Sequence, residues 1–585
     1  MIHPPIRIIG GVVAVIVLLA LPQLVPPFYV NLLVLIGIYG FVTTGLVLLT
    51  GYAGLASLGH AAFFGFGAYG AAILAGTFGL NPWLSLIAGA AISAASAYLS
   101  GLPLLRLSGH YLALATLAWG LIASTLFTQL DFLTGGADGF TNIPILSFFG
   151  IRLVAAEHFY YLVLAVAALG AIMLAVLLNS RSGRAIRALR SSEVATASLG
   201  VNVSRLKLQV FILSAAFAGL GGGLYAYFIA FIGPSTFDIG ASIRFLAMAM
   251  IGGAHPLGGI VGAGIITILD NTLQDVLPNA RGQFQVIAYG AVLVILMIAS
   301  PKGLAPLLRL LWRPHTGTGH DGAIDIPAPQ PEAAAPTRLQ VCDAEQRFGG
   351  LLAVSQLSFE VTSGEIVGLI GPNGAGKTTA FNLISGVLPP SSGQILLDGQ
   401  DVTHSSPQRM AKLGLTRTFQ NTALFDMSVL ENVMMGAYPH TRGNIWTGMV
   451  GLGHADRVTT RTEALRLLKR VGLDDPAAPA ESLSVGQRRL LEVARALALK
   501  PRVLLLDEPA AGLRFAEKQA LADLLRRLKQ EGIALLLVEH DMDLVMNLAD
   551  RLLVMNYGKT LAEGDPQQIA NNPAVIEAYL GTDAA

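Results

Sequence analysis

Charge is distributed so unevenly along this chain that its two parts cannot share one solvent. Residues 1–312 contain only 13 basic and 7 acidic residues, and the first acidic residue is Asp131. The remaining 273 residues contain 55 charged residues. Soluble proteins carry about 25% charged residues, whereas the whole chain carries 13% and is 53% hydrophobic. We therefore expect a membrane domain in the first part and a soluble domain in the second.

This composition excludes several classes of protein. A chain that is 53% hydrophobic is not intrinsically disordered, and its shortage of charge does not suit a simple cytosolic enzyme. The single cysteine, Cys342, excludes an intrachain disulfide framework and a cysteine-rich metal site. A net charge of +1 gives no global basic field, so we expect no nucleic-acid partner.

A helix that spans a bilayer needs about 20 predominantly apolar residues. The stretches that approach this length are Ile8–Val25, Tyr29–Leu49, Leu55–Phe78, Trp83–Leu105, Tyr111–Leu130, Phe159–Leu178, Lys207–Phe231, Ile243–Leu269 and Phe284–Ile298. Glycines interrupt several of them, notably Gly219–Gly223 and the pair Gly252-Gly253, so we expect some to be half-spans or re-entrant segments. The sequence predicts a transmembrane domain over residues 1–312 with about eight to ten helical segments.

Basic residues predict the orientation, because cytoplasmic loops carry an excess of Lys and Arg. One loop has Glu193 as its only acidic residue and contains Arg181, Arg184, Arg187, Arg190, Arg205 and Lys207. Further basic residues follow the last stretch, namely Lys302, Arg309 and Arg313. Both regions should face the cytoplasm, and the second domain should lie there too.

Five ionisable residues fall within or beside the apolar stretches: His60, His110, His255, Asp270 and Asp275. Ionisable groups are costly in a membrane and are often functional. Packing or helix-end roles are the simpler explanation, and the sequence identifies no partner for them. No substrate ligand is assigned.

Residues 313–337 are rich in Pro, Ala and Gly and lack apolar periodicity, which is typical of a semi-extended linker. An ordered loop packed on the second domain is the alternative. The second domain then covers residues 338–585.

The second domain contains a phosphate-binding loop directly after a strand-like apolar run. Its segment fits G-x-x-x-x-G-K-[ST] and consists of Gly371, Pro372, Asn373, Gly374, Ala375, Gly376, Lys377, Thr378 and Thr379. The glycines allow backbone N–H groups to surround phosphate, Lys377 reaches the β- and γ-phosphates, and the Thr378 hydroxyl binds Mg²⁺. We therefore expect ATP and Mg²⁺ as cofactors.

A second apolar run, Val503–Leu506, ends in Asp507 and Glu508. A run this apolar suits the centre of a parallel sheet. Asp507 is placed to hold Mg²⁺, and Glu508 is placed to orient the attacking water. An acidic helix cap is the alternative, but it does not explain why the chain also has a phosphate loop. The predicted fold is a multi-span α-helical membrane domain followed by an α/β P-loop ATPase domain.

Residues 338–585 resemble the ABC-type ATPases in five ordered motifs. Leu483–Gln487 resembles the family's signature motif, which implies that Ser484, Gly486 and Gln487 bind nucleotide. Gln420 is similar to the Q-loop glutamine, with catalytic and metal-binding roles, and His540 to the catalytic switch histidine. Phe348 matches the aromatic residue that stacks on adenine.

Two positions depart from the family pattern. Arg514 follows Gly512-Leu513 where the family usually has Asp or Asn in its D-loop, and Val485 replaces a common glycine. Neither change removes a catalytic group. The Arg514 change bears on communication between two ATP sites.

The membrane part resembles the M-type permease of bacterial branched-chain amino acid importers. The similar segments are Gly51–Tyr69, Thr134–Gly139, Ser182–Arg184 and Glu193–Gly200. Ala254-His255-Pro256 departs from the usual small residues there. The long insert after Glu431–Val433 and the ending Val575–Gly581 resemble the G-type ATPase of the same system. The chain therefore looks like a fusion of the two.

This resemblance implies ATP-driven import of branched-chain amino acids across the bacterial inner membrane. The implied partners are an H-type permease, an F-type ATPase, a periplasmic solute-binding protein, the amino acid substrate and membrane lipid. Import of urea or short amides is an alternative. Export and a membrane-anchored ATPase without transport are less favoured. The loop Arg181–Gly200 is the expected coupling element in a groove near Gln420, with Glu193 and Gly200 in coupling roles.

Overall fold

The computed structural model describes residues 4–148, 151–276, 303–311, 336–418 and 424–580, together with single positions between 287 and 298. The chain divides into two compact units. The helical unit comprises the described residues of Met1–Asn179 and Ser204–Thr316. The sheet unit comprises Ser180–Val203 and the described residues from Pro336 onward. The predicted linker lies outside the described residues except for its last two.

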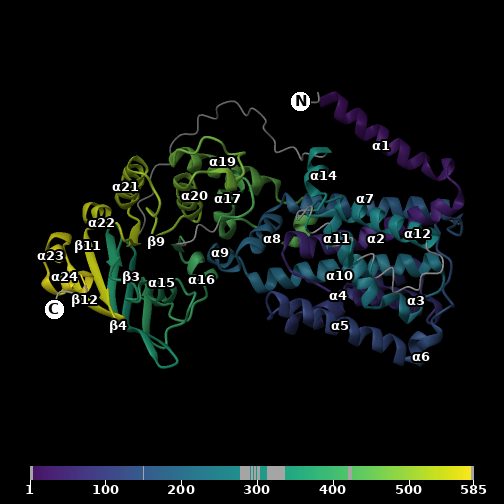
Figure 1. The fold of residues 1–585 in the computed structure, drawn as a ribbon, viewed down its shortest axis with the longest axis horizontal. Coiled ribbons are helices and arrows are strands. Elements are labelled where there is room, and N and C mark those ends of the chain that lie inside the picture. Colours follow the sequence, from purple (N-terminus) through teal and green to yellow (C-terminus); the bar gives the residue numbers. More distant parts are fainter. Residues whose placement is uncertain are drawn as a thin grey trace. The chain divides into compact units, whose positions relative to one another are not determined.

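The helical unit is built from apolar helices (Figure 1). They are α1 (Pro4–Leu24), α2 (Pro27–Leu46), α3 (His60–Gly76), α4 (Pro82–Leu104), α5 (His110–Gln129), α7 (Ala156–Leu178), α10 (Val203–Ile229), α11 (Ile239–Gly252) and α12 (Gly258–Val276). Short elements between and after them are η1 (Val47–Tyr52), α6 (Asp131–Thr134), η2 (Gly136–Asp138), β1 (Ser147–Phe148), β2 (Ile151–Arg152), η3 (Pro234–Phe237) and α14 (Ala305–Leu311).

Within the described residues, five helical segments are long and apolar enough to cross a membrane. One of these is α2 together with η1, and the others are α4, α5, α7 and α10. Shorter apolar helices include α3, α11 and α12. Most of the ninth predicted stretch, residues 284–298, lies outside the described residues. The predicted range of eight to ten segments therefore stays a prediction.

The two predicted glycine breaks have different outcomes. The break at Gly252-Gly253 is confirmed, because α11 ends at Gly252, Gly253 has φ +69°, and α12 begins at Gly258. The expected break at Gly219–Gly223 is wrong, because α10 runs through it from Val203 to Ile229.

These α10 glycines allow close helix packing. A Cβ on Gly222 would lie 2.0 Å from the carbonyl oxygen of Phe64 in α3. A Cβ on Gly67 in α3 would lie 2.1 Å from the carbonyl oxygen of Gly219. Small residues let helices in membranes approach until their backbones touch. The glycine cluster is therefore an interface between two helices and does not interrupt α10.

A non-helical segment precedes α3, so the third helix begins later than the predicted Leu55. Non-helical backbone at membrane depth needs other hydrogen-bond partners. The Leu58 N–H donates to Thr116 Oγ1 at 3.0 Å, and the Ala61 N–H donates to Ser242 Oγ at 3.1 Å. Side chains from α5 and α11 thus satisfy the backbone that leads into α3.

The sheet unit contains two sheets. The six-stranded sheet has the order β12-β11-β5-β10-β9-β8, in which only the β11–β12 pair is antiparallel. Its strands are β5 (Ile366–Ile370), β8 (Leu415–Arg417), β9 (Val503–Asp507), β10 (Ala534–Val538), β11 (Arg551–Asn556) and β12 (Lys559–Gly564). The antiparallel sheet has the order β4-β3-β6-β7 and consists of β3 (Arg338–Phe348), β4 (Leu351–Thr362), β6 (Ser392–Leu397) and β7 (Gln400–Asp401).

Helices complete this unit. They are α8 (Arg181–Ser191), α9 (Glu193–Ser198), α15 (Lys377–Ile384), α16 (Pro407–Lys412), α17 (Val429–Gly436), η4 (Tyr438–His440), α18 (Ile445–Met449), α19 (His454–Arg470), η5 (Ala480–Ser482), α20 (Val485–Leu497), α21 (Phe515–Gln530), α22 (Met542–Leu548), α23 (Pro566–Ala570) and α24 (Pro573–Leu580).

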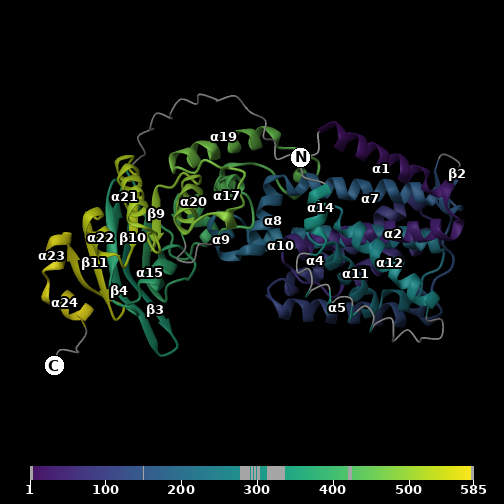
Figure 2. The same cartoon turned by 45° about the horizontal axis from the view of Figure 1, so that its top comes forward.

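The parallel strands form the buried centre of the sheet unit. Every residue of β5, β9 and β10 is buried, as expected for strands covered on both faces. One apolar core joins them to the antiparallel sheet and α15, and a second joins them to α17, α19, α20, α21 and α22. Figures 1 and 2 show the β3–β4 hairpin on one side of these strands and α20 and α21 on the other. The predicted α/β arrangement is confirmed.

Candidate nucleotide site and coupling surface

The predicted phosphate loop connects the buried strand β5 to the start of α15. Gly371, Gly374 and Gly376 have φ values of +153°, +81° and +101°, which residues with a Cβ rarely adopt. A Cβ on Gly371 would lie 2.2 Å from the carbonyl oxygen of Met555, and one on Gly376 would lie 2.5 Å from that of Ala353. Neighbouring strands therefore fix the ends of the loop. Thr378, the expected Mg²⁺ ligand, is exposed at the start of α15.

Lys377 holds its charge inside this loop. Its side chain is buried, and Nζ donates hydrogen bonds to the carbonyl oxygens of Gly371 at 2.7 Å and Pro372 at 3.0 Å. Burial lowers the pKa of Lys377, while the charges of Glu508 and Asp507 oppose that shift. The loop thus positions a cation where a phosphate chain would need it.

Asp507 ends β9 and is held by an arginine that the sequence reasoning missed. Arg417 Nη2 donates to Asp507 Oδ2 at 2.8 Å, and both side chains are almost fully buried. Arg417 Nη1 also donates to Asn382 Oδ1 at 2.7 Å and Ser385 Oγ at 3.1 Å, both at α15. Arg417 therefore ties the predicted metal ligand to the helix that follows the phosphate loop. The sequence did contain one indication of this role, because a charged residue within a buried strand needs a partner.

Glu508 follows directly and has a different environment. Its φ is +49°, a strained value for a residue with a side chain. His540 Nε2 lies 3.1 Å from Glu508 Oε1, and the Glu508 N–H donates to the Val538 carbonyl oxygen at 2.8 Å. The structure thus brings together the two residues that the sequence assigned to catalysis. Gln420, the third, lies outside the described residues.

The signature-like segment begins α20. Ser484 caps the helix, accepting a hydrogen bond from the Gln487 N–H at 3.2 Å, while Gln487 Oε1 accepts one from the Ser484 N–H at 3.1 Å. A Cβ on Gly486 would lie 2.3 Å from Glu517 Oε1, and Glu517 also accepts from the Arg514 N–H. The side chains of Ser484, Gln487 and Arg514 are exposed. Within the described residues, no hydrogen bond joins this segment to the phosphate loop.

Two aromatic residues belong to elements near the loop. Phe348 ends β3 and is half-exposed, in the hairpin that contributes Ala353 to the loop's surroundings. Tyr579 of α24, whose side chain the sequence reasoning did not select, has the backbone of Gly371 as an electrostatic neighbour. Burial raises the pKa of the Tyr579 hydroxyl. Helix α24 therefore reaches the neighbourhood of the first residue of the phosphate loop.

Residues 180–203 pack on the sheet unit, although they lie between helices of the helical unit in sequence. Arg187 forms a bidentate ion pair with Glu431 of α17, with hydrogen bonds of 3.1 and 2.5 Å. Burial alone would raise the pKa of Glu431, but the charge and hydrogen bonds of Arg187 outweigh it and hold that pKa below its ordinary value. Arg184 is buried beside this pair, and burial lowers its pKa to about 10.

Further contacts join residues 180–203 to the rest of the sheet unit. The Arg181 guanidinium donates to the carbonyl oxygens of Gly443 and Tyr438 and lies 3.7 Å from the centroid of the Tyr438 ring. Gly200 has φ +81°, and a Cβ there would lie 2.7 Å from Pro439 Cγ. Glu193 is exposed at the start of α9. We call Arg181, Arg184, Arg187 and Gly200, with Glu431, Tyr438 and Pro439, the docking surface.

The five ionisable residues predicted within or beside the apolar stretches differ in burial and in hydrogen bonding. His60 is fully buried at the start of α3, where neither ring nitrogen has a hydrogen-bond partner among the described residues, and His255 accepts from the Leu257 N–H. His110 begins α5 and is exposed. Asp270 lies on α12, and the side chain of Asp275 lies outside the described residues.

Comparisons with known proteins cover both parts of the chain. A family described as "Branched-chain amino acid transport system / permease component" matches residues 28–300. An ABC transporter family matches residues 354–511, and the family "Branched-chain amino acid ATP-binding cassette transporter" matches residues 559–585.

Individual relatives match the second part. The high-affinity branched-chain amino acid transport ATP-binding protein LivG of Escherichia coli K12 is 43% identical over 248 residues, which is 42% of this chain and 97% of that protein. BraF of Pseudomonas aeruginosa, with the same description, is 42% identical over 250 residues, again 42% and 97%. A crystal structure of a nucleotide-free ATP-binding cassette from an ABC transporter is 30% identical, covers 42% of this chain and 99% of that chain, and has a TM-score of 0.38.

Proposed function

Because the chain belongs to the branched-chain amino acid family of ABC transporters, we propose that it hydrolyses ATP to import leucine, isoleucine and valine across the bacterial inner membrane. The observation that carries this proposal is the presence in one chain of a permease match, a formed phosphate loop and the Glu508–His540 pair. Neither part alone would couple ATP hydrolysis to movement of a solute.

Hydrolysis depends on a few side chains with separate roles. Lys377 binds the β- and γ-phosphates, and the N–H groups of Gly371–Gly376 surround them. Glu508 orients and polarises the attacking water, and His540 fixes the Glu508 carboxylate through the 3.1 Å contact. The backbone at Glu508 is strained, with a φ of +49°. Phe348, at the end of β3, would stack on the adenine ring.

The proposed metal ligands suit Mg²⁺. The Thr378 hydroxyl and the Asp507 carboxylate supply the hard oxygen donors that this ion prefers, and Gln420 is proposed as a third ligand. Arg417 already binds one Asp507 oxygen, and the other oxygen would remain for Mg²⁺. Bound Mg²⁺ would neutralise charge on the phosphates.

A complete ATP site needs a second ATPase domain. Ser484, Gly486 and Gln487 are proposed to contact the phosphate loop of another subunit, which is consistent with the exposure of Ser484 and Gln487 and their local hydrogen bonds. We propose an H-type permease and an F-type ATPase as the other half, with a periplasmic solute-binding protein as donor. The exposed Arg514 suits a transporter whose two ATP sites differ.

We propose that the docking surface transmits closure of the ATPase domains to the permease helices. Because α8 and α9 follow the movement of the domain on which they pack, closure of two ATPase domains on ATP would pull or push these helices and the permease helices joined to them. ATP drives this change only through its higher affinity for the closed state. The basic residues of this surface agree with a cytoplasmic position.

Uptake of radiolabelled solutes tests the substrate. The chain is purified with the products of its neighbouring genes and reconstituted in vesicles with the binding protein. We expect leucine, isoleucine and valine to compete with one another, while urea and acetamide do not compete at equal concentration. Uptake of urea without leucine uptake would contradict the proposal and favour the amide alternative.

Mass measurement of the intact complex tests the assembly. The expected mass corresponds to one copy of this chain with one different permease and one different ATPase. A stable complex of two copies of this chain alone, active in leucine uptake, would overturn the heteromeric assembly.

A further inference from the structure

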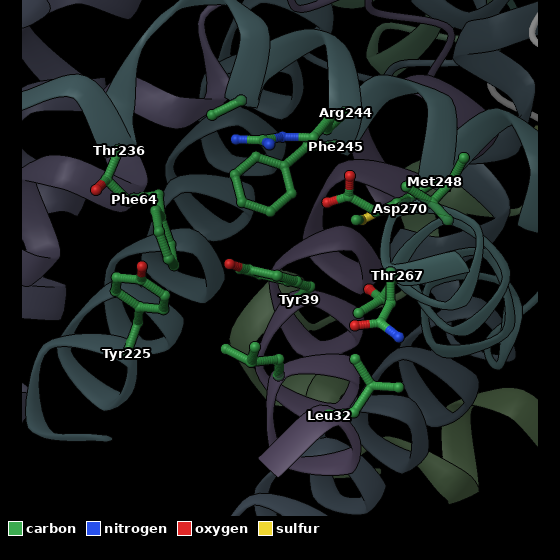
Figure 3. A pocket seen from close by; sticks show the side chains of 14 residues that line it. Leu32, Tyr39, Phe64, Tyr225, Thr236, Arg244, Phe245, Met248, Thr267 and Asp270 are labelled. Atoms are coloured by element: carbon green, nitrogen blue, oxygen red, sulfur yellow. The ribbon is translucent and has the colours of Figure 1, made fainter. Parts of the chain in front are cut away.

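The helical unit contains a cavity of about 340 Å³ between its helices (Figure 3). Residues of α2, α3, α10, η3, α11 and α12 line it. Cavities that bind small molecules are mostly apolar with a few converging polar groups. This cavity has that character, because one part of its lining is aromatic and another part is charged.

Four aromatic side chains form one wall. Tyr39 lies 5.7 Å from Phe245 and 6.2 Å from Tyr225 between ring centroids. Phe64 lies 5.4 Å from Tyr225 and 5.3 Å from Phe245. Each ring therefore contacts two or more of the others, and the wall comes from four different helices. Its rings, with Met248 beside them, form a surface for an aliphatic group.

The charged groups in this lining are one cation and one anion. Arg244 of α11 and Asp270 of α12 both line the cavity, and both act electrostatically on Tyr39. Figure 3 shows the Arg244 guanidinium and the Asp270 carboxylate beside the Phe245 ring. Among the described residues, these two side chains do not form an ion pair within 4.0 Å. The sequence analysis considered Asp270 but did not identify Arg244.

Two oxygen atoms in the lining lack partners. Asp270 Oδ1 and Thr267 Oγ1 are buried without a hydrogen-bond partner in the described part of the chain. Most buried polar atoms in proteins do have one, and an unpartnered buried carboxylate oxygen is costly. The lining therefore has an unsatisfied acceptor and a separate cation facing an aromatic wall.

We propose that this cavity is a transient binding site for a zwitterionic amino acid with an aliphatic side chain during its passage through the permease. The Arg244 guanidinium binds the α-carboxylate, for which its planar donors are suited. Asp270 Oδ1 accepts a hydrogen bond from the α-ammonium, and the aliphatic group lies on the aromatic wall. This inference rests on the proposed import of branched-chain amino acids. A neutral amide such as urea would leave both charges without counterions.

Photo-crosslinking in the complete reconstituted transporter tests the site. The probe is a diazirine analogue of leucine that retains the α-amino and α-carboxylate groups. We expect it to label peptides that contain Tyr39 or the segment 244–248, and we expect leucine to suppress this labelling. Leucinamide, which lacks the carboxylate, and 4-methylpentanoate, which lacks the amine, should each compete at least about tenfold less well. Competition by either analogue equal to that of leucine would overturn the assignment.

Substitutions test the two charges separately. Arg244→Met and Asp270→Asn should each reduce cavity labelling about tenfold or more, while Arg244→Lys should restore part of it. Arg152→Met and Asp138→Asn are the matched controls, because both residues are exposed outside the cavity and should label like the wild type. Undiminished labelling in Arg244→Met and Asp270→Asn would contradict the proposal.

Wild-type uptake separates this inference from the proposed function. If the wild type takes up leucine but the probe labels only other segments, the cavity assignment is wrong while the proposed function stands. If the wild type does not take up leucine at all, the proposed function fails, and the site proposed for its substrate fails with it. The competition experiment uses the wild type, so it tests the cavity assignment even if a variant does not fold.

Discussion

Asp507 and Glu508 are neighbours in sequence, yet the fold gives them different surroundings. The Asp507 carboxylate is buried and bound to Arg417, so its position is fixed before any ligand arrives. The Glu508 side chain turns toward His540 through a left-handed backbone conformation. The surroundings of these two adjacent acids thus suit their proposed roles as a fixed metal ligand and a positioned base. Residues in strained conformations often mark active sites.

Substitution of Glu508 and Lys377 separates hydrolysis from binding. Glu508→Gln should retain ATP binding and lower hydrolysis about 10²–10⁴-fold, because it removes the carboxylate that we propose to activate water. Lys377→Ala should abolish tight ATP binding, because it removes the cation that we propose to pair with the β- and γ-phosphates. Equilibrium ATP binding and phosphate release measure the two effects. Glu463→Gln, at an exposed ion pair, is the control, and wild-type turnover in Glu508→Gln would disprove its role as base.

Loss of Arg417 should destabilise the protein. Arg417→Met leaves the Asp507 carboxylate buried without its cation, and removal of one partner from a buried pair costs about 3–5 kcal/mol. Arg526→Met breaks an exposed pair with Asp523 and should cost less than about 1 kcal/mol. Thermal unfolding of the purified full chain compares the two variants. Equal melting temperatures would show that the Arg417–Asp507 pair does not stabilise the fold.

Among the elements, the contact between α3 and α10 depends on the absence of side chains. Gly222→Ala would place a Cβ 2.0 Å from the Phe64 carbonyl oxygen, so the helices must separate at a cost of about 1–3 kcal/mol. Gly264→Ala in α12 is the matched control, because the nearest atom to its Cβ, Ile36 Cγ2, would lie 3.7 Å away. Thermal stability in detergent should fall for Gly222→Ala and not for Gly264→Ala. The reverse order would contradict the packing account.

At the docking surface, a side chain on Gly200 should uncouple the two activities. Gly200→Val adds backbone strain of about 1–2 kcal/mol and a clash with Pro439, 2.7 Å from its Cβ. Gly472→Val adds similar strain at φ +76° but meets no atom within 4 Å. Leucine uptake and solute-stimulated hydrolysis should fall in Gly200→Val and persist in Gly472→Val, while ATP binding persists in both. Glu193→Trp should act like Gly200→Val, and unimpaired uptake in both would exclude the coupling role.

Local signals account for the elements that the sequence predicts well. The phosphate loop, the strand that ends at Asp507 and most apolar helices depend on residues close together in the chain. The prediction for the α10 glycines was wrong because a glycine cluster is typical both of a helix break and of a close contact between two helices. Only the position of the opposing helix shows which of the two occurs. Arg417 was missed because its partners lie 90 and 35 residues away. Arg244 was missed because the cavity joins helices that are distant in sequence.

For the whole molecule, the chain from residue 313 to residue 337 is not the only covalent connection between the two units. The segment 180–203 belongs to the permease in sequence and packs with the ATPase domain in space. This segment therefore connects the two units independently of the chain from residue 313 to residue 337. We expect the fused chain to work with a second permease and a second ATPase, because one chain supplies half of each pair.

The most direct test of the central claim is ATP-dependent accumulation of radiolabelled leucine in vesicles that contain the complete transporter and its binding protein. The wild type should accumulate leucine against its gradient when ATP is present on the ATPase side, and accumulation should cease without ATP. A transporter with Glu508→Gln should bind ATP but accumulate almost no leucine. Equal accumulation with and without ATP, or in the Glu508→Gln transporter, would contradict the claim that this chain couples ATP hydrolysis to import.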